Sequence, residues 1–161
     1  TGRSANITYL PTGGRTPISQ NTPGARNWNN YNQLRRTSNG TLIRHAGNDI
    51  AIPEGTPVHS MASGRVLRCS NRGNNGGMGR YVTIDHGTDR QGRRVVSRYM
   101  HNSNVVVRRN QVVRTGQRIA LSGNTGRSTG PHIHYEIRVN NRPVNPNTFN
   151  WGNVRIRNNN N

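Results

Sequence analysis

The chain has 161 residues, with 23 Arg, no Lys and only 5 acidic residues, for a formal net charge of +18. This length fits one domain with one core, and no apolar run approaches the roughly 20 residues that span a bilayer. The single cysteine, Cys69, excludes an intramolecular disulfide.

The first 40 residues are polar and rich in turn-forming residues, and we expect an irregular N-terminal lead segment over residues 1–40. Trp28, Tyr31 and Leu34 are spaced three apart. They are compatible with one helical turn, or with simple packing against the body of the protein.

The body, residues 41–150, is predicted to be mainly β. The chain has 19 Gly and 8 Pro, which favours turns and short strands over long helices. Runs typical of strands occur at residues 57–61, 64–69, 80–85, 94–101, 104–107, 117–121 and 132–139. This spacing predicts an antiparallel sheet folded as a sandwich or partial barrel. The low-complexity residues 151–161 are expected to form a flexible C-terminal tail.

The run from His132 to Ile137 has the alternation of a half-buried strand. With a side-chain period of two, His132, His134 and Glu136 share one face, while the other face is apolar and should enter the core. Two imidazoles at this spacing lie roughly 6–7 Å apart, which is too far for both to bind one metal from a regular strand. The pattern therefore suits one ligand and one neighbour. Glu136 is interpreted as an exposed acid, with the orientation of an imidazole as the alternative.

A second pair, His45 and Asp49, has the spacing H-x-x-x-D, which lets both side chains reach one ion from a helix or from a turn entering a strand. Gly47 favours the turn, and the apolar residues 50–52 place Asp49 at the start of a strand. Two imidazoles and one carboxylate form an open zinc site, with the fourth position left for water. Further histidines, such as His101, would then handle protons at that site. Cys69 is an alternative ligand, but its interpretation as a packed side chain is preferred.

These motifs occur in an order that resembles the lysostaphin-type (LytM-domain) zinc metallopeptidases, which cut peptide cross-links in bacterial peptidoglycan. The matching stretches are His45–Ala51, Gly55–Val58, Tyr81–Gly87, Tyr99–His101, Thr115–Ala120 and Ser122–Glu136, within residues 43–146. The last stretch is the most specific.

The resemblance implies that Zn²⁺ is held by His45, Asp49 and His134, and that His101 and His132 are the catalytic pair beside the metal. It also implies a β-sheet groove walled by loops. Asn48 and Asn102 stand where the family usually has an aliphatic residue and Leu, and the Phe-Gly-x-Arg entry to the domain is missing. These departures leave the ligand set intact and affect the groove wall.

Two further histidines, His59 and His86, receive no ligand role from the resemblance. We interpret His86 as a structural residue at a strand end and His59 as a packed or surface imidazole.

The functional hypothesis is a zinc-dependent endopeptidase of the bacterial cell envelope, secreted or periplasmic, acting on peptidoglycan peptide stems and cross-bridges. The bond is a D-Ala to diamino-acid link or a glycine-rich bridge. The positive charge suits anionic wall or envelope polymers. The alternatives are an inactive wall-binding or activator module of the same fold, and an Arg-driven nucleic-acid binder. The binder is disfavoured because aromatic residues are only 5% and show no basic–aromatic interleaving.

Overall fold

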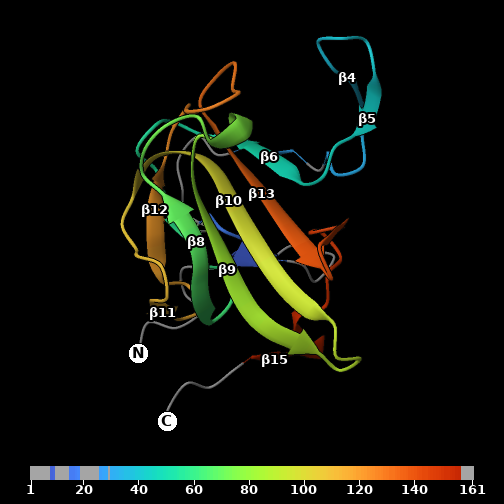
Figure 1. Cartoon of the computed structure of the whole chain (residues 1–161), viewed down its shortest axis with the longest axis vertical. Helices are drawn as coiled ribbons and strands as arrows, with labels where there is room; N and C mark the ends of the chain where they lie inside the picture. The colour runs from blue at the N-terminus through green and yellow to red at the C-terminus, as the bar shows by residue number, and fades with distance from the viewer. Residues whose placement is uncertain (1–7, 10–14, 19–25, 29, 157–161) are drawn as a thin grey trace.

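The computed structural model describes residues 8–9, 15–18, 26–28 and 30–156 (Figure 1). Strands and two short 3₁₀ helices make up its regular structure, in this order: β1 (Thr8–Tyr9), β2 (Arg15–Thr16), β3 (Arg26–Trp28), β4 (Leu34–Arg36), β5 (Leu42–Arg44), β6 (Asn48–Ala51), β7 (Pro57–His59), β8 (Gly64–Ser70), η2 (Asn75–Gly77), β9 (Arg80–Asp89), β10 (Arg94–Val105), β11 (Val112–Val113), β12 (Arg118–Ser122), β13 (His132–Val139), β14 (Arg142–Val144), η3 (Trp151–Asn153) and β15 (Val154–Ile156). No helix in these residues is long and apolar enough to cross a membrane.

One large antiparallel sheet organises the molecule, in the order β11-β8-β9-β10-β13-β6-β3. Outside this path, β12 pairs with β10 and with β7, β14 pairs with β13, and β15 pairs with β9. In Figure 1 the long strands β8, β9, β10 and β13 run side by side as a twisted layer. The prediction of a mainly β, antiparallel fold is confirmed, and the sheet does not close into a barrel.

The alternation predicted for β13 decides which face of the sheet enters the core. Ile133, Tyr135 and Ile137 are completely buried, together with Tyr99 of β10 and Ile84 of β9. Burial of such side chains contributes about 1.5–3 kcal/mol each. The opposite face of the same strands therefore carries the polar side chains.

Both ends of the chain hold more regular structure than the sequence indicated. Residues 1–40 contribute β3, which pairs with β6 at the sheet edge, and β4, which pairs with β5 in a hairpin that stands apart from the large sheet (Figure 1). Trp28 and Leu34 therefore lie in strands and not in one helical turn. At the other end, Trp151 is buried and β15 pairs with β9, so ordered structure continues into the expected tail. Strands of two or three residues are too short to show a hydrophobic period, which explains why they were missed. Residues 157–161 lie outside the described part.

A fully buried imidazole, that of His86, extends from β9 into the core. His86 Nδ1 lies 2.8 Å from the Ser63 carbonyl oxygen, and Nε2 lies 2.7 Å from Ser97 Oγ, which in turn is 2.9 Å from the Tyr99 hydroxyl. Burial outweighs the hydrogen bond to Ser63 and lowers the pKa of His86 to about 4. This placement agrees with a structural role for His86, but the residue lies within β9 and not at a strand end.

We expect His86 to make the protein less stable as the pH falls. The folded state binds its proton only near pH 4, whereas the unfolded chain binds one near pH 6.5. Stability is therefore intact above pH 6.5 and is lost as the pH falls from 6.5 towards 4, by about 2 kcal/mol between pH 7.5 and pH 5. Urea denaturation of the wild type and of His86→Gln at both pH values measures this loss. The wild type should lose about 2 kcal/mol more than the variant, and equal losses would contradict the assignment.

Candidate metal centre

The pairing of β6 with β13 places two of the predicted ligands opposite each other. Asp49 and His134 are register partners, and His45 lies in the turn that leads into β6. The turn can approach β13 only because residue 47 is glycine: a Cβ there would lie 2.1 Å from the carbonyl oxygen of Tyr135. The sequence therefore brings the three side chains together through one strand pair and one close backbone approach.

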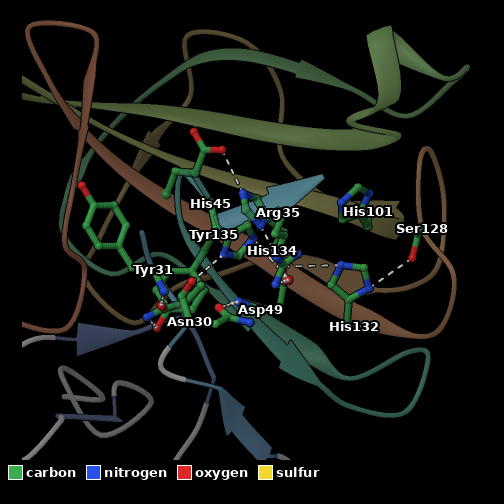
Figure 2. A network of polar contacts seen from close by, with 12 residues as sticks. Asn30, Tyr31, Arg35, His45, Asp49, His101, Ser128, His132, His134 and Tyr135 are labelled. Atoms are coloured by element: carbon green, nitrogen blue, oxygen red, sulfur yellow. Dashed lines mark hydrogen bonds and ion pairs between the residues drawn. The ribbon is translucent and has the colours of Figure 1, made fainter. Parts of the chain in front are cut away.

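The potential ligand atoms of His45, Asp49 and His134 all lie within 4.8 Å of one another. His134 Nδ1 is 2.8 Å from Asp49 Oδ1, and His45 Nε2 is 3.3 Å from Asp49 Oδ2. Figure 2 shows the three side chains converging from β6, the preceding turn and β13.

The other nitrogen of each candidate ligand imidazole has a fixed partner. His45 Nδ1 is 3.0 Å from the carbonyl oxygen of Asn30, and His134 Nε2 is 2.8 Å from Glu136 Oε2. A carbonyl or carboxylate partner of this kind holds a metal-binding histidine in one tautomer and orientation. Two nitrogens and one carboxylate oxygen, each held in this way, fit the donor set of an open zinc site.

The electrostatics of this cluster favour a cation between the carboxylates. Burial alone would raise the pKa of Asp49, but hydrogen bonds from His134 and His45 outweigh it and hold that pKa well below its usual range. Burial likewise disfavours a charged His134, yet its hydrogen bonds with Asp49 and Glu136 raise its pKa to about 9. The pKa of Glu136 is lowered to about 2 by His134 and Arg138 against the opposing effect of burial. Two ionised carboxylates thus flank one imidazole.

The two histidines predicted to act beside the metal stand next to the cluster. His132 Nε2 is 3.6 Å from Asp49 Oδ1, and the rings of His101 and His132 have centroids 4.8 Å apart. His101 Nδ1 is 2.8 Å from the Thr125 carbonyl oxygen, and His132 Nδ1 is 2.8 Å from that of Gly130. In the neutral form both Nδ1 atoms donate to carbonyls, which leaves both Nε2 atoms as acceptors. Burial lowers the pKa of His101 to about 4, so its ring is neutral at pH 7.

A break in β10 aims His101 at this position. The pairing of β10 with β9 shifts between Tyr99 and Asn102, so β10 holds an extra residue there, and His101 has φ of 66°. This left-handed conformation is uncommon for a residue other than glycine and costs of order 1 kcal/mol. The backbone N–H of His101 donates to the Met78 carbonyl, and Asn102 Nδ2 donates to the carbonyls of Arg80 and Tyr99. These bonds hold the bulge in place.

All five predicted side chains line one open cleft of about 860 Å³. Its walls come from the loop around η2, from residues 127–131 and from the β4–β5 hairpin, which contributes Arg35 and Arg36. Arg35 Nη2 reaches within 3.2 Å of Asp49 Oδ2. The predicted groove walled by loops is thus present over the sheet face that carries the histidines.

Several residues have roles that the sequence did not reveal. The interpretation of Glu136 as an exposed acid is wrong: it is 4% exposed and contacts His134 and Arg138, because β13 lies inside the sheet. Asn30 and Arg35 were missed, since they come from a polar stretch without periodicity. Asn48 is buried, and its amide contacts Tyr135 and Asn147.

The remaining candidates lie elsewhere. His59 is buried, with Nδ1 3.0 Å from the Gly116 carbonyl oxygen, and it does not line the cleft. Cys69 is partly buried against the core and, among the described residues, does not belong to the candidate metal-binding group.

Comparison with known proteins points to one family. The model of peptidase family M23 matches residues 43–146. The peptidoglycan DD-endopeptidase ShyA of Vibrio cholerae is 48% identical over 101 residues, which are 63% of this chain and 22% of ShyA. A zinc-containing peptidase from Vibrio cholerae has a similar structure, with a TM-score of 0.70 and 29% identity over 88% of this chain and 45% of that one. Lysostaphin from Staphylococcus simulans has a TM-score of 0.63 and 28% identity over 80% of this chain and 51% of lysostaphin. The chain spans about a fifth of the length of ShyA.

We expect Glu136→Gln to weaken zinc binding by about 10–100-fold, the usual effect of changing the partner of a ligand histidine. The amide keeps the size of the side chain but removes the negative charge that favours a cation at His134. Zinc affinity measured by competition with a chromogenic chelator tests this. Glu54→Gln is the matched control, because Glu54 is exposed and should leave the affinity unchanged. Equal affinities for the two variants would contradict the role of Glu136.

Proposed function

The chain belongs to peptidase family M23, and on this basis we propose that it is a zinc-dependent endopeptidase that hydrolyses peptide cross-links of bacterial peptidoglycan. The observation that carries the proposal is the convergence of His45, Asp49 and His134, with His101 and His132 beside them in an open cleft. The complete set of positions favours an enzyme over an inactive wall-binding module. The corresponding location is the bacterial cell envelope, secreted or periplasmic.

In the proposed mechanism His45, Asp49 and His134 hold Zn²⁺. When bound, the ion would polarise the scissile carbonyl and lower the pKa of water towards about 7. One of His101 and His132 takes a proton from the attacking water at its free Nε2, and the other, in its protonated form, donates a hydrogen bond to the carbonyl oxygen or gives its proton to the leaving amine. Glu136 is not the base, because His134 and Arg138 occupy its carboxylate.

We propose that the bond cut is a D,D-link between D-Ala and a diamino acid. Support comes from ShyA, which carries the name peptidoglycan DD-endopeptidase and is 48% identical over 101 residues. The basic surface would hold the enzyme near anionic wall or envelope polymers, which is a general effect of net charge.

Purified sacculi of different cross-link types provide the test. Zinc-loaded protein should release cross-link-cleaved muropeptides, detected by mass spectrometry, from sacculi with D-Ala to diamino-acid links, and a chelator should stop the release. His134→Ala should lose zinc, measured by elemental analysis, because one of three ligands is gone. His132→Ala should keep zinc and lose about 10²–10⁴-fold in rate.

Three results would count against the proposal. Release that continues in chelator would remove the metal from the mechanism. Full activity of His132→Ala would remove that residue from the catalytic pair. Stoichiometric zinc with no product from any sacculus type would favour the inactive module.

A further inference from the structure

A second hollow of about 530 Å³ adjoins the metal-centre cleft. Met78 lines both hollows, so they meet at the loop that holds η2. Strands β8, β9, β10 and β13 form the floor of the second hollow, which no step of the proposed mechanism uses.

The two hollows lie end to end on one face of the sheet. Along β13, His134 lines the cleft and Arg138 lines the second hollow, with Glu136 between them in the same two-residue alternation. Along β10, Met100 lines the cleft and Arg98 the second hollow, and these residues pair in register with His134 and Glu136. A molecule that extends along the sheet from the metal centre therefore passes directly over the second hollow.

Positive charge dominates the second hollow. Among the residues that the structure describes, its lining includes no acidic residue and four arginines: Arg68, Arg94, Arg98 and Arg138. Arg94 pairs with Asp85. Glu136 is 2.8 Å from Arg138 Nε but 3.9 Å from Arg98 Nη1, and it also contacts His134. The single carboxylate of Glu136 is thus shared between two arginines and a histidine.

The positive charges of two of these guanidinium groups have little or no neutralisation by a neighbouring carboxylate. Arg68 has no ion pair among the described residues. Within the same part of the chain, the one ion pair of Arg98 is the 3.9 Å contact with Glu136, and the Arg98 side chain is 28% exposed. Burial, and then the neighbouring charge of Arg138, lower the pKa of Arg98. Positive groups crowded in this way attract an oxyanion, and the planar guanidinium matches a carboxylate bidentately.

We propose that the second hollow is a substrate subsite in which Arg98 and Arg68 bind a free carboxylate of the peptidoglycan stem peptide. The proposal rests on the proposed function, because it names a feature of the substrate. Along β13, Glu136 lies two residues and Arg138 four residues from His134, which corresponds to distances of roughly 7 Å and 14 Å along the strand. An extended peptide covers this distance in two to four residues, so the recognised carboxylate belongs to the molecule that is being cut.

Matched substrates test the subsite. One is a D,D-linked stem-peptide dimer with free carboxylates, and the other is the same dimer with these groups amidated. Zinc-loaded wild type should cleave the acid form with a kcat/KM about 10–100-fold higher than that for the amidated form. This is the usual contribution of a hydrogen bond to a charged group. Arg98→Gln should lose at least about 10-fold on the acid form through KM, with kcat unchanged, and less than 2-fold on the amide. Arg68→Gln should act in the same direction.

Arg109→Gln is the matched control, because it removes the same charge from an exposed position that lines neither hollow. It should keep the wild-type preference. Zinc content of each variant, by elemental analysis, should stay stoichiometric. Equal cleavage of acid and amide by the wild type would overturn the proposal, as would an Arg98→Gln loss that is the same on both substrates.

Binding separates failure of the subsite from failure of the proposed function. If wild type cleaves neither dimer, the endopeptidase proposal fails, and calorimetry with the same two dimers decides the subsite alone. At least about 10-fold tighter binding of the acid form, lost in Arg98→Gln, would support the subsite. Equal binding of both dimers would overturn it. Arg98-dependent binding of glycerol 3-phosphate together with equal binding of both dimers would also overturn it, in favour of a wall-polymer phosphate.

Discussion

The pairing of β6 with β13 is the constraint on which the candidate metal centre depends. It sets Asp49 opposite His134, and the absence of a side chain at residue 47 lets the turn that carries His45 approach β13. A shift of one residue in this register would turn His134 to the apolar face and Ile133 to the cleft. The hydrophobic alternation of β13, which buries Ile133, Tyr135 and Ile137, therefore also determines the ligand geometry.

Because the chain has so few carboxylates, the positions of these groups indicate where a cation can bind. The chain has five acidic residues against 23 arginines, and two of the five, Asp49 and Glu136, flank His134. Asp85 and Asp89 pair with Arg94 and Arg93, at the end of the sheet where β9 turns into β10. Negative charge in a buried position is costly unless it is paired. Its concentration around one imidazole, in a strongly basic protein, fits a centre that binds a cation.

The sequence predicts the fold, and the face on which the candidate ligands lie, where a pattern has a physical period. The two-residue alternation of His132–Ile137 separates the core face from the cleft face, and the glycine in H-x-x-x-D marks the turn. Glu136 was misread because alternation shows which face a side chain occupies but not whether neighbouring strands and loops cover that face. The Glu136 carboxylate is enclosed by side chains that share its face, which are His134 and Arg138 of β13 and Arg98 of β10, and this arrangement depends on the pairing of β13 with β10.

Other contributions to the site have no local signal. The bulge at His101 is created by the unequal number of residues between paired positions of β9 and β10, and no residue type marks it. Asn30 contacts His45, and Arg35 contacts Asp49. In both pairs the two residues are far apart in the sequence. Such contacts follow from the path of the chain across the sheet edge, which local propensity does not specify.

The different positions of the His132 and His134 imidazoles follow from strand geometry. Residues two apart on a strand share a face but stand roughly 6–7 Å apart, so only one can occupy a given metal position. His134 faces Asp49 through Nδ1, the nitrogen nearer its backbone, and Glu136 holds the far nitrogen. His132 turns Nδ1 back to its own loop at Gly130 and extends Nε2 towards Asp49, where His101 approaches from the bulge in β10. Opposite use of the two ring nitrogens lets a regular strand present one imidazole within the candidate metal-binding group and a second imidazole beside it, from the same face.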